Sequence, residues 1–352
     1  MALTRPDSPL RWLFVVPASI GLGWLFDRWN VPAGWILAAI VVSGTVALGT
    51  GHDLQVNKYY RRFGRGIIGI LAAMPIVGVS LGEIAGTLIP AAVFGAVTVG
   101  AGVGGGILLG RSEKEISTET AILSMLPGGA STMPALADEI GADYRYVALV
   151  QYLRLLIVSV TLPAVAHLLT PPAEGGHAIG ADFHFNLLAA VLIVAAAMLG
   201  DPIGQKLKIP AAGVLCPMLL AVIGSWVTPD SISFEPPMVF AVMAFLSIGW
   251  IAGGALSVPT LKLFARQLPV TVAYIFFMMA VCAGAGVLAA LWTGVTHFEG
   301  YLATTPGALE TVLALSAEGG AGSEVITFQI LRLVAVLLLA AWLPQILRIM
   351  RR

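Results

Sequence analysis

Long apolar runs separated by short polar segments fill most of the chain. The runs cover about residues 11–28, 32–49, 65–82, 85–110 and 146–169 in the first half, and 186–202, 210–227, 237–256, 268–292 and 324–345 in the second. A helix needs about 20 apolar residues to cross a bilayer. The pattern therefore predicts ten membrane crossings, some of them short, with residues 171–185 as a polar linker.

One apolar segment in each half is interrupted at its centre by proline and glycine. The two segments cover residues 116–141 and 300–320, with Pro127-Gly128-Gly129 in the first and Pro306-Gly307 in the second. Proline removes a backbone donor and glycine permits a sharp turn. The arms on either side are each about 12–17 Å of helix, or half a bilayer. Two structures fit this pattern, a re-entrant hairpin and a single crossing helix that is unwound at its centre.

The second half of the sequence repeats the first at a constant offset. Gln151 matches Gln329, and Arg154 matches Arg332 within the similar stretches VQYLRLLIV and FQILRLVAV. The same offset relates Gly129 to Gly307, so we expect a duplicated fold. The predicted fold is all-α and polytopic. Its repeats cover residues 1–170 and 186–352, each with about five transmembrane helices and one re-entrant hairpin or broken helix.

Positive charges predict how the repeats are oriented. With five crossings per repeat, the second repeat is inverted and nearly all Lys and Arg fall on the cytoplasmic side, as the positive-inside rule requires. These include the predicted loop with Lys58, Arg61, Arg62 and Arg65. Six crossings per repeat would place Lys206, Lys208, Lys262 and Arg266 outside. We therefore expect hairpins that enter from opposite faces, with both termini in the cytoplasm.

Composition supports a membrane protein. Hydrophobic residues make up 58% and charged residues 11% of the chain, and the mean hydropathy is +0.92. The net charge of zero gives no electrostatic reason to expect a nucleic-acid partner. The apolar stretch from Trp12 to Leu25 resembles a signal peptide, but its place in the first repeat predicts that it is retained. The five histidines do not cluster in sequence, so we expect neither an enzyme nor a metal or other cofactor.

The interrupted segments are the first candidate binding site. Broken helices expose unpaired backbone N–H groups that attract anions. Neighbouring hydroxyl groups add further hydrogen-bonding capacity, although they could instead satisfy the local backbone. The candidate residues are Pro127, Gly128, Gly129, Ser131 and Thr132 in the first segment, and Thr304, Thr305, Pro306 and Gly307 in the second.

Two arginines lie deep within predicted crossings. Arg154 and Arg332 each follow a glutamine, Gln151 and Gln329, by one helical turn. An arginine at membrane depth faces protein or water rather than lipid. The pair could bind an anionic substrate, or each arginine could cap the carbonyl groups of a hairpin tip. Glu310, three residues after Gly307, could carry a proton or pair with Arg332.

The motifs around these residues resemble a known bacterial family. LPGGASTMPALADEIGAD from Leu126, VALVQYLRLL from Val147, ATTPGALETVLALS from Ala303 and QILR from Gln329 are similar to the AbrB family of membrane proteins. Its members are named as regulators of aidB expression or labelled ammonia monooxygenase, and are distinct from the small DNA-binding regulator of the same name. The second tip departs from the first in having one glycine instead of two. The resemblance implies an inner-membrane protein of the inverted-repeat secondary transporter type, with no settled substrate.

The predicted function is secondary active transport of small organic anions, coupled to H⁺ or Na⁺ and working by alternating access. The expected partners are the small-molecule substrate, the coupling ion, the lipid bilayer and, as one option, a second copy in a homodimer. Two alternatives remain at this point. One is a channel or exporter of small neutral solutes, and the other is a membrane sensor that regulates gene expression.

Overall fold

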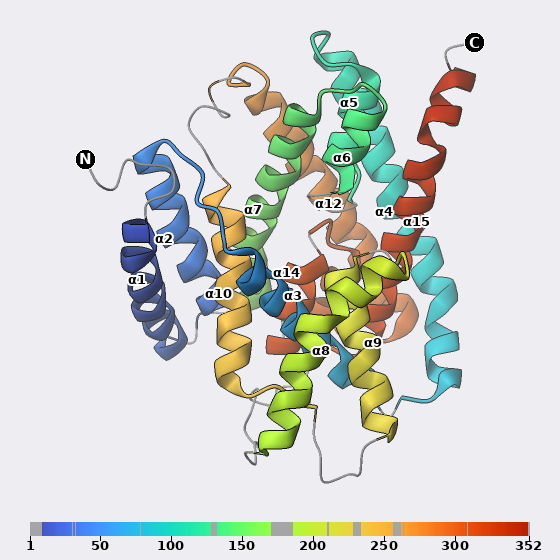
Figure 1. The fold of residues 1–352 in the computed structure, drawn as a ribbon. Coiled ribbons are helices and arrows are strands. Elements are labelled where there is room, and N and C mark those ends of the chain that lie inside the picture. The colour runs from blue at the N-terminus through green and yellow to red at the C-terminus, as the bar shows by residue number, and fades with distance from the viewer. Residues whose placement is uncertain are drawn as a thin grey trace. The chain divides into compact units, whose positions relative to one another are not determined.

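A computed structural model describes residues 9–29, 31, 33–77, 79–127, 132–169, 186–209, 211–227, 234–255, 262, 264–307 and 309–350. These residues are mostly helical and contain no strand, in agreement with the predicted all-α class. The main helices are α1 (Pro9–Arg28), α2 (Gly34–Thr50), α3 (Lys58–Ala73), α4 (Leu81–Ser112), α5 (Thr118–Met125), α6 (Thr132–Glu139), α7 (Tyr144–Leu168), α8 (Leu187–Lys206), α9 (Ala212–Val227), α10 (Met238–Gly254), α12 (Leu268–Thr293), α13 (His297–Thr304), α14 (Leu309–Glu318) and α15 (Ser323–Met350) (Figure 1).

Within the described ranges, three helices are long and apolar enough to cross a membrane. They are the Ala85–Ser112 part of α4, α8 and α12, with 28, 20 and 26 residues. Helices α2, α9 and α10 are also apolar but shorter. The chain is therefore a membrane protein by the length and composition of its helices, whereas the predicted number of ten crossings is not settled by them.

The predicted crossing at residues 65–82 is displaced in the structure. Helix α3 begins at Lys58, where the Asn57 side chain accepts a hydrogen bond from the Tyr59 N–H at 2.9 Å. It ends at Ala73, and a short 3₁₀ turn that contains Pro75 follows. The basic residues expected in a loop thus form the first two turns of this helix, because an asparagine cap starts the helix earlier than hydropathy indicates.

The helices recur at the spacing seen in the sequence. Moved by the offset that takes Gln151 to Gln329, the bounds of α1 become those of α8, and the bounds of α2, α3 and α7 fall close to those of α9, α10 and α15. Backbone detail recurs as well. Ala33 before α2 and Ala211 before α9 both adopt left-handed conformations, with φ of 54° and 46°. Such values are uncommon for residues other than glycine, so their recurrence supports a duplicated fold.

The chain forms two compact units. Unit 1 contains Met1–Ser80, Ser159–Val258 and Glu310–Ser323, and unit 2 contains Leu81–Val158, Pro259–Leu309 and Glu324–Arg352. Each unit combines segments from both halves of the sequence. The two interrupted segments are divided differently between the units. Helices α5 and α6 both belong to unit 2, whereas α13 belongs to unit 2 and nearly all of α14 to unit 1.

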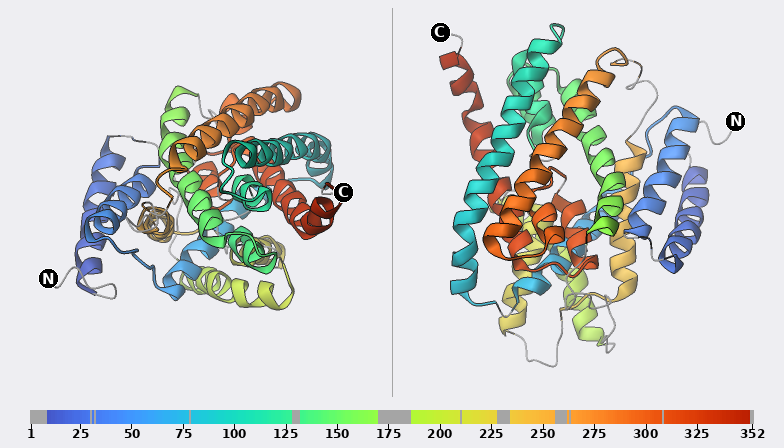
Figure 2. Two further views of the ribbon diagram at one scale, coloured as in Figure 1. Left: turned by 90° about the horizontal axis from the view of Figure 1, so that it is seen from above. Right: turned by 180° about the vertical axis from the view of Figure 1, so that it is seen from behind.

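Within unit 1, α2 packs on α1 and α10, and α9 packs on α3 and α8. The two packings are related by the repeat, since α1 corresponds to α8, α2 to α9 and α3 to α10. Within unit 2, α4 packs on α5 and α12 on α13, and α4 also lies beside α12 (Figure 2). Each short helix before an interruption is therefore supported by a long apolar helix.

Glycines on α4 allow α5 to approach closely. Gly102, Gly106 and Gly110 are spaced one turn apart, and an added Cβ on any of them would contact α5 or the residues that follow it. At Gly106 this Cβ would lie 2.5 Å from Ile122 Cα and 2.9 Å from Ala121 O. No such neighbour lies within 4 Å of a Cβ at Gly104.

We expect Gly106→Ala to destabilise the protein by about 1–3 kcal/mol, because the α5 backbone must move to admit the methyl group. Gly104→Ala is the matched control and should be neutral or stabilising by up to about 1 kcal/mol, as glycine disfavours helices. Thermal unfolding of the two purified variants in detergent measures the difference. Equal stabilities would contradict the close packing of α4 on α5.

Candidate functional site

The first interrupted segment is held from α7 by two adjacent side chains. Helix α5 begins after the Ser117 cap and ends at Met125, with Leu126 as its C-cap just before Pro127. The Gln151 amide nitrogen donates to the carbonyl oxygens of Leu123, Ser124 and Leu126 at 2.9, 3.2 and 3.0 Å. Arg154 Nη1 donates to the carbonyls of Met125 and Leu126, both at 3.1 Å, and its Nη2 donates to Gln151 Oε1 at 2.7 Å.

The second interrupted segment is held from α15 in the same way. Helix α13 starts with a capping box formed by Thr296 and Glu299. Gln329 donates to the Leu302 and Ala303 carbonyls at 2.6 and 3.3 Å. Arg332 donates to the carbonyls of Thr305 and Gly307 and to Gln329 Oε1.

The two sets of hydrogen bonds are related by the repeat. Gln151 lies 28 residues after its acceptor Leu123, whereas Gln329 lies 27 residues after its acceptor Leu302. The difference is the second glycine of the first tip, which has Pro-Gly-Gly where the second has Pro-Gly. The interruption absorbs this extra residue, so the glutamine reaches the end of the preceding helix in both halves.

Breaking a helix leaves its last carbonyl groups without partners inside the helix. Both arginines fill this need, so the capping role proposed from the sequence is confirmed for Arg154 and Arg332. The tip residues Gly128, Gly129 and Ser131 lie outside the described part of the chain, as does the side chain of Thr132. Pro127, Thr304, Thr305, Pro306 and Gly307 are all buried, and Thr304 Oγ1 is bound to the carbonyls of Cys282 and Gly300 at 2.8 and 3.1 Å.

Capping does not balance the charge of these arginines. Each is 3% exposed, and neither forms an ion pair with any carboxylate of the described residues. The Arg332 charge acts on Arg154, and both act on the buried thiol of Cys282, so these groups lie near one another in unit 2. Within the described part of the chain, the Nε atoms of both arginines are buried without a hydrogen-bond partner.

Burying an unpaired charge is costly, and burying two of the same sign near each other is more so. Carbonyl oxygens offset part of this cost through charge-assisted hydrogen bonds. A negatively charged ligand that accepts hydrogen bonds from the free Nε groups would offset much of the remainder. The arrangement is thus suited to bind a small anion.

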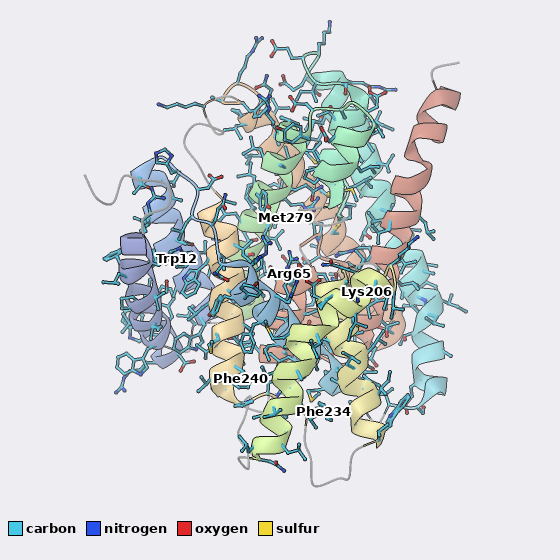
Figure 3. The ribbon with its side chains drawn as sticks, in the orientation of Figure 1. Trp12, Arg65, Lys206, Phe234, Phe240 and Met279 are labelled. Atoms are coloured by element: carbon cyan, nitrogen blue, oxygen red, sulfur yellow. The ribbon has the colours of Figure 1, made fainter. Side chains whose placement is uncertain are left out.

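The sequence suggested that Glu310 could pair with Arg332, but the structure gives Glu310 a different partner. Glu310 Oε1 instead lies 3.3 Å from Arg65 Nε in unit 1, and the Arg332 nitrogens donate to carbonyl oxygens and Gln329. Arg65 lies near the middle of α3 (Figure 3). The two side chains are 35% and 23% exposed. Arg65 was not among the candidate site residues, because no local motif marks a partner so distant in sequence.

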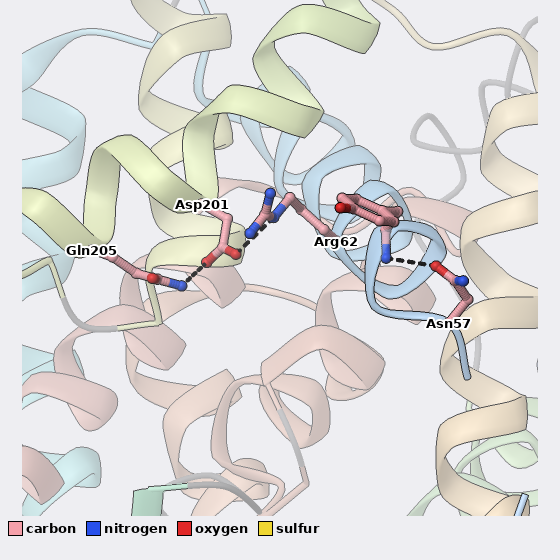
Figure 4. Close-up of polar contacts among 5 residues, drawn as sticks. Asn57, Arg62, Asp201 and Gln205 are labelled. Atoms are coloured by element: carbon pink, nitrogen blue, oxygen red, sulfur yellow. Dashed lines mark hydrogen bonds and ion pairs between the residues drawn. The ribbon is translucent and has the colours of Figure 1, made fainter. Parts of the chain in front are cut away.

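A second ion pair lies beside Arg65 in unit 1. Arg62 Nε donates to Asp201 Oδ2 at 3.0 Å, and Gln205 donates to Asp201 Oδ1 at 2.9 Å (Figure 4). Asp201 Oδ1 and Arg65 Cδ would both lie 3.5 Å from a Cβ added to Gly213. The charges of this cluster are matched within unit 1, in contrast to those of the two buried arginines of unit 2.

Comparison with known proteins places these features in a family. The family model described as "Transition state regulatory protein AbrB" matches residues 35–350. The chain belongs to the AbrB family. The matched region includes both interrupted segments and both Gln-Arg pairs, so the resemblance suggested by the sequence motifs is confirmed.

Two relatives of this AbrB-family chain come from Escherichia coli and Bacillus subtilis. A protein of Escherichia coli (strain K12), named as a candidate regulator, AbrB, is 29% identical over 339 residues, which cover 94% of each chain. A protein of Bacillus subtilis (strain 168) with the name YhjN, described as uncharacterized, is 24% identical over 233 residues, or 62% of this chain and 60% of its own. Neither name identifies a solute.

Proposed function

We propose that this AbrB-family protein is a secondary transporter of small organic anions, with two inverted repeats and alternating access. The observation that carries the proposal is the pair of buried arginines, Arg154 and Arg332. They lie near each other in unit 2, without an ionised partner among the described residues, and each keeps one buried N–H donor free. A small carboxylate would supply both the charge and the acceptors.

Broken helices at membrane depth support the same proposal. Non-helical backbone is tolerated within a membrane where it lines a cavity or is buried in protein, and transporters with inverted repeats bind solute at such breaks. The positive-inside pattern supports the inverted arrangement, with both termini in the cytoplasm and the protein in the inner membrane of a bacterium. We expect no chemical change of the solute.

Anion binding by the purified protein tests the proposal. We expect some small carboxylates to raise the unfolding temperature of the wild-type protein, because ligands that bind the folded state stabilise it. Arg154→Lys and Arg332→Lys should each weaken this binding by about 10- to 100-fold, since lysine keeps the charge but loses the planar donor set. Arg266→Lys, at an arginine that is 81% exposed, is the control and should bind normally.

Liposomes that contain the protein then separate transport from sensing. A transporter exchanges labelled for unlabelled anion across the membrane, whereas a sensor binds the anion without moving it. If no carboxylate stabilises the wild-type protein or enters the liposomes, the anion site is wrong and the arginines only cap the hairpins. Uptake of a neutral solute with unchanged Arg154→Lys activity would favour a channel instead.

A further inference from the structure

Glu318 is a carboxylate of unit 1 that differs from Glu310 and Asp201 in having no ion-pair partner among the described residues. It is the last residue of α14, the second arm of the second interrupted segment. Its Oε1 accepts a hydrogen bond from the Ala33 N–H at 2.8 Å, across 285 residues of sequence. Its Oε2 is buried and has no hydrogen-bond partner among the residues that the structure describes. No described arginine or lysine forms an ion pair with it.

The partner of Glu318 is the buried backbone at the N-terminus of α2. Ala33 precedes α2 in a left-handed conformation and has no side chain that could cap the helix. A carboxylate at a helix N-terminus satisfies a free N–H and interacts favourably with the helix dipole. In the first repeat the residue that corresponds to Glu318 is Ile140, which has no carboxylate. This contact is thus specific to the second half of the chain.

The surroundings of Glu318 favour a bound proton. Its Oε1 accepts only the Ala33 N–H of the described residues and its buried Oε2 accepts none, so few hydrogen bonds compensate the ionised form for its loss of water. Two other charged groups on α1 and α14 have partners of their own. Arg28, next to Asp27, lies over the Trp24 ring, and Glu310 on the same helix is paired with Arg65. Helix α2 has no titratable side chain between Gly34 and Thr50.

We propose that Glu318 is the proton-binding group through which a proton gradient drives anion transport, so that the coupling ion is H⁺. The proposal rests on the transport function argued above. Ionised Glu318 holds α14 to the N-terminus of α2. Proton binding removes the charge that the helix dipole stabilises and weakens this hold. A proton taken from water on one side is released on the other side, together with the anion.

Helix α14 connects this group to the arginine site along the chain. It begins at Leu309, shortly after Gly307, whose carbonyl accepts from Arg332. The first arm and the tip up to Leu309 belong to unit 2, and the remainder of α14 belongs to unit 1. A change in how unit 1 holds α14 is therefore transmitted along the chain to Gly307, whose carbonyl accepts a hydrogen bond from Arg332.

Proteoliposomes with an imposed pH gradient test the proposal. One proton per monovalent anion would let one pH unit produce about tenfold accumulation in the wild type. Glu318→Gln keeps an oxygen for the Ala33 N–H but cannot titrate. We expect its accumulation to fall to about onefold, at equilibrium with the medium, while anion exchange at equal pH continues. Glu115→Gln, at a carboxylate that is 54% exposed and paired with Arg266, is the control and should accumulate normally.

Infrared spectroscopy of the carboxyl stretch provides a readout that does not depend on transport. We expect one carboxyl signal to titrate near neutral pH in wild type and to be missing in Glu318→Gln. If the wild type exchanges no anion, the transport function fails while this signal still tests proton binding. Normal pH-driven uptake by Glu318→Gln, or uptake driven by a Na⁺ gradient alone, would overturn the coupling role.

Should Glu318→Gln not fold, Glu318→Asp serves in its place. Aspartate can still bind a proton, but it is one methylene shorter and cannot reach the Ala33 N–H in the same way. We expect a shifted pH profile of uptake. A profile identical to wild type would overturn the proposal.

Discussion

Replacing Arg332 or Arg154 with alanine is expected to destabilise the protein by about 3 kcal/mol or more, because hydrogen bonds of buried charged groups contribute strongly and their removal leaves buried acceptors unpaired. In Arg332→Ala, the acceptors that lose their donor are the carbonyls of Thr305 and Gly307 and the amide oxygen of Gln329. For Arg154 they are two carbonyls and Gln151 Oε1. Both variants should also lose anion binding. Thermal unfolding with and without anion measures both effects.

The matched control is Arg266→Ala, since Arg266 is 81% exposed and forms a surface ion pair with Glu115. Exposed pairs contribute little, so its stability should stay within about 1 kcal/mol of wild type. Glu310→Gln should not rescue Arg332→Ala, because the ion pair of Glu310 is with Arg65. Rescue by Glu310→Gln, or a loss as small as that of Arg266→Ala, would contradict the capping role of Arg332.

The sequence predicted helix bounds best where proline, glycine or polar residues mark the ends of the apolar runs. The predicted runs at 268–292 and 146–169 agree closely with α12 and α7. The interruptions at Pro127 and Pro306 were also predicted correctly, because proline and glycine act locally on the backbone. The run at 65–82 failed because a polar cap and a basic first turn start α3 before its apolar residues begin.

Partners across the fold were less predictable. Gln151 and Arg154 could be assigned to a neighbouring tip, because a broken helix must leave free carbonyl groups and the two sides of the tip are close in sequence. Arg65 and Glu310 lie in different halves of the chain, and no periodic pattern links them. Glu318 gave no signal at all, since a single glutamate at the end of a short helix is usually a solvated residue.

Helix α3 depends on a glycine where it crosses α9. A Cβ added at Gly69 would lie 2.2 Å from the carbonyl oxygen of Val214 and 3.2 Å from its Cα. Real Cβ atoms do not approach backbone so closely, and a helix backbone cannot move aside as a flexible side chain does. The packing of α3 on α9 in unit 1 therefore requires glycine at this position.

We expect Gly69→Val to destabilise the protein by about 3 kcal/mol or more, at the upper end of the cost of overpacking. Gly49→Val is the matched control, because Gly49 is also helical but has nothing within 4 Å of an added Cβ. Valine is slightly better than glycine in a helix, so the control should keep wild-type stability or gain a little. Unfolding temperature and the yield of monodisperse protein measure the difference. Similar values for the two variants would mean that α3 does not pack against the backbone of α9, and the arrangement of α3 that positions Arg65 beside Glu310 would be wrong as well.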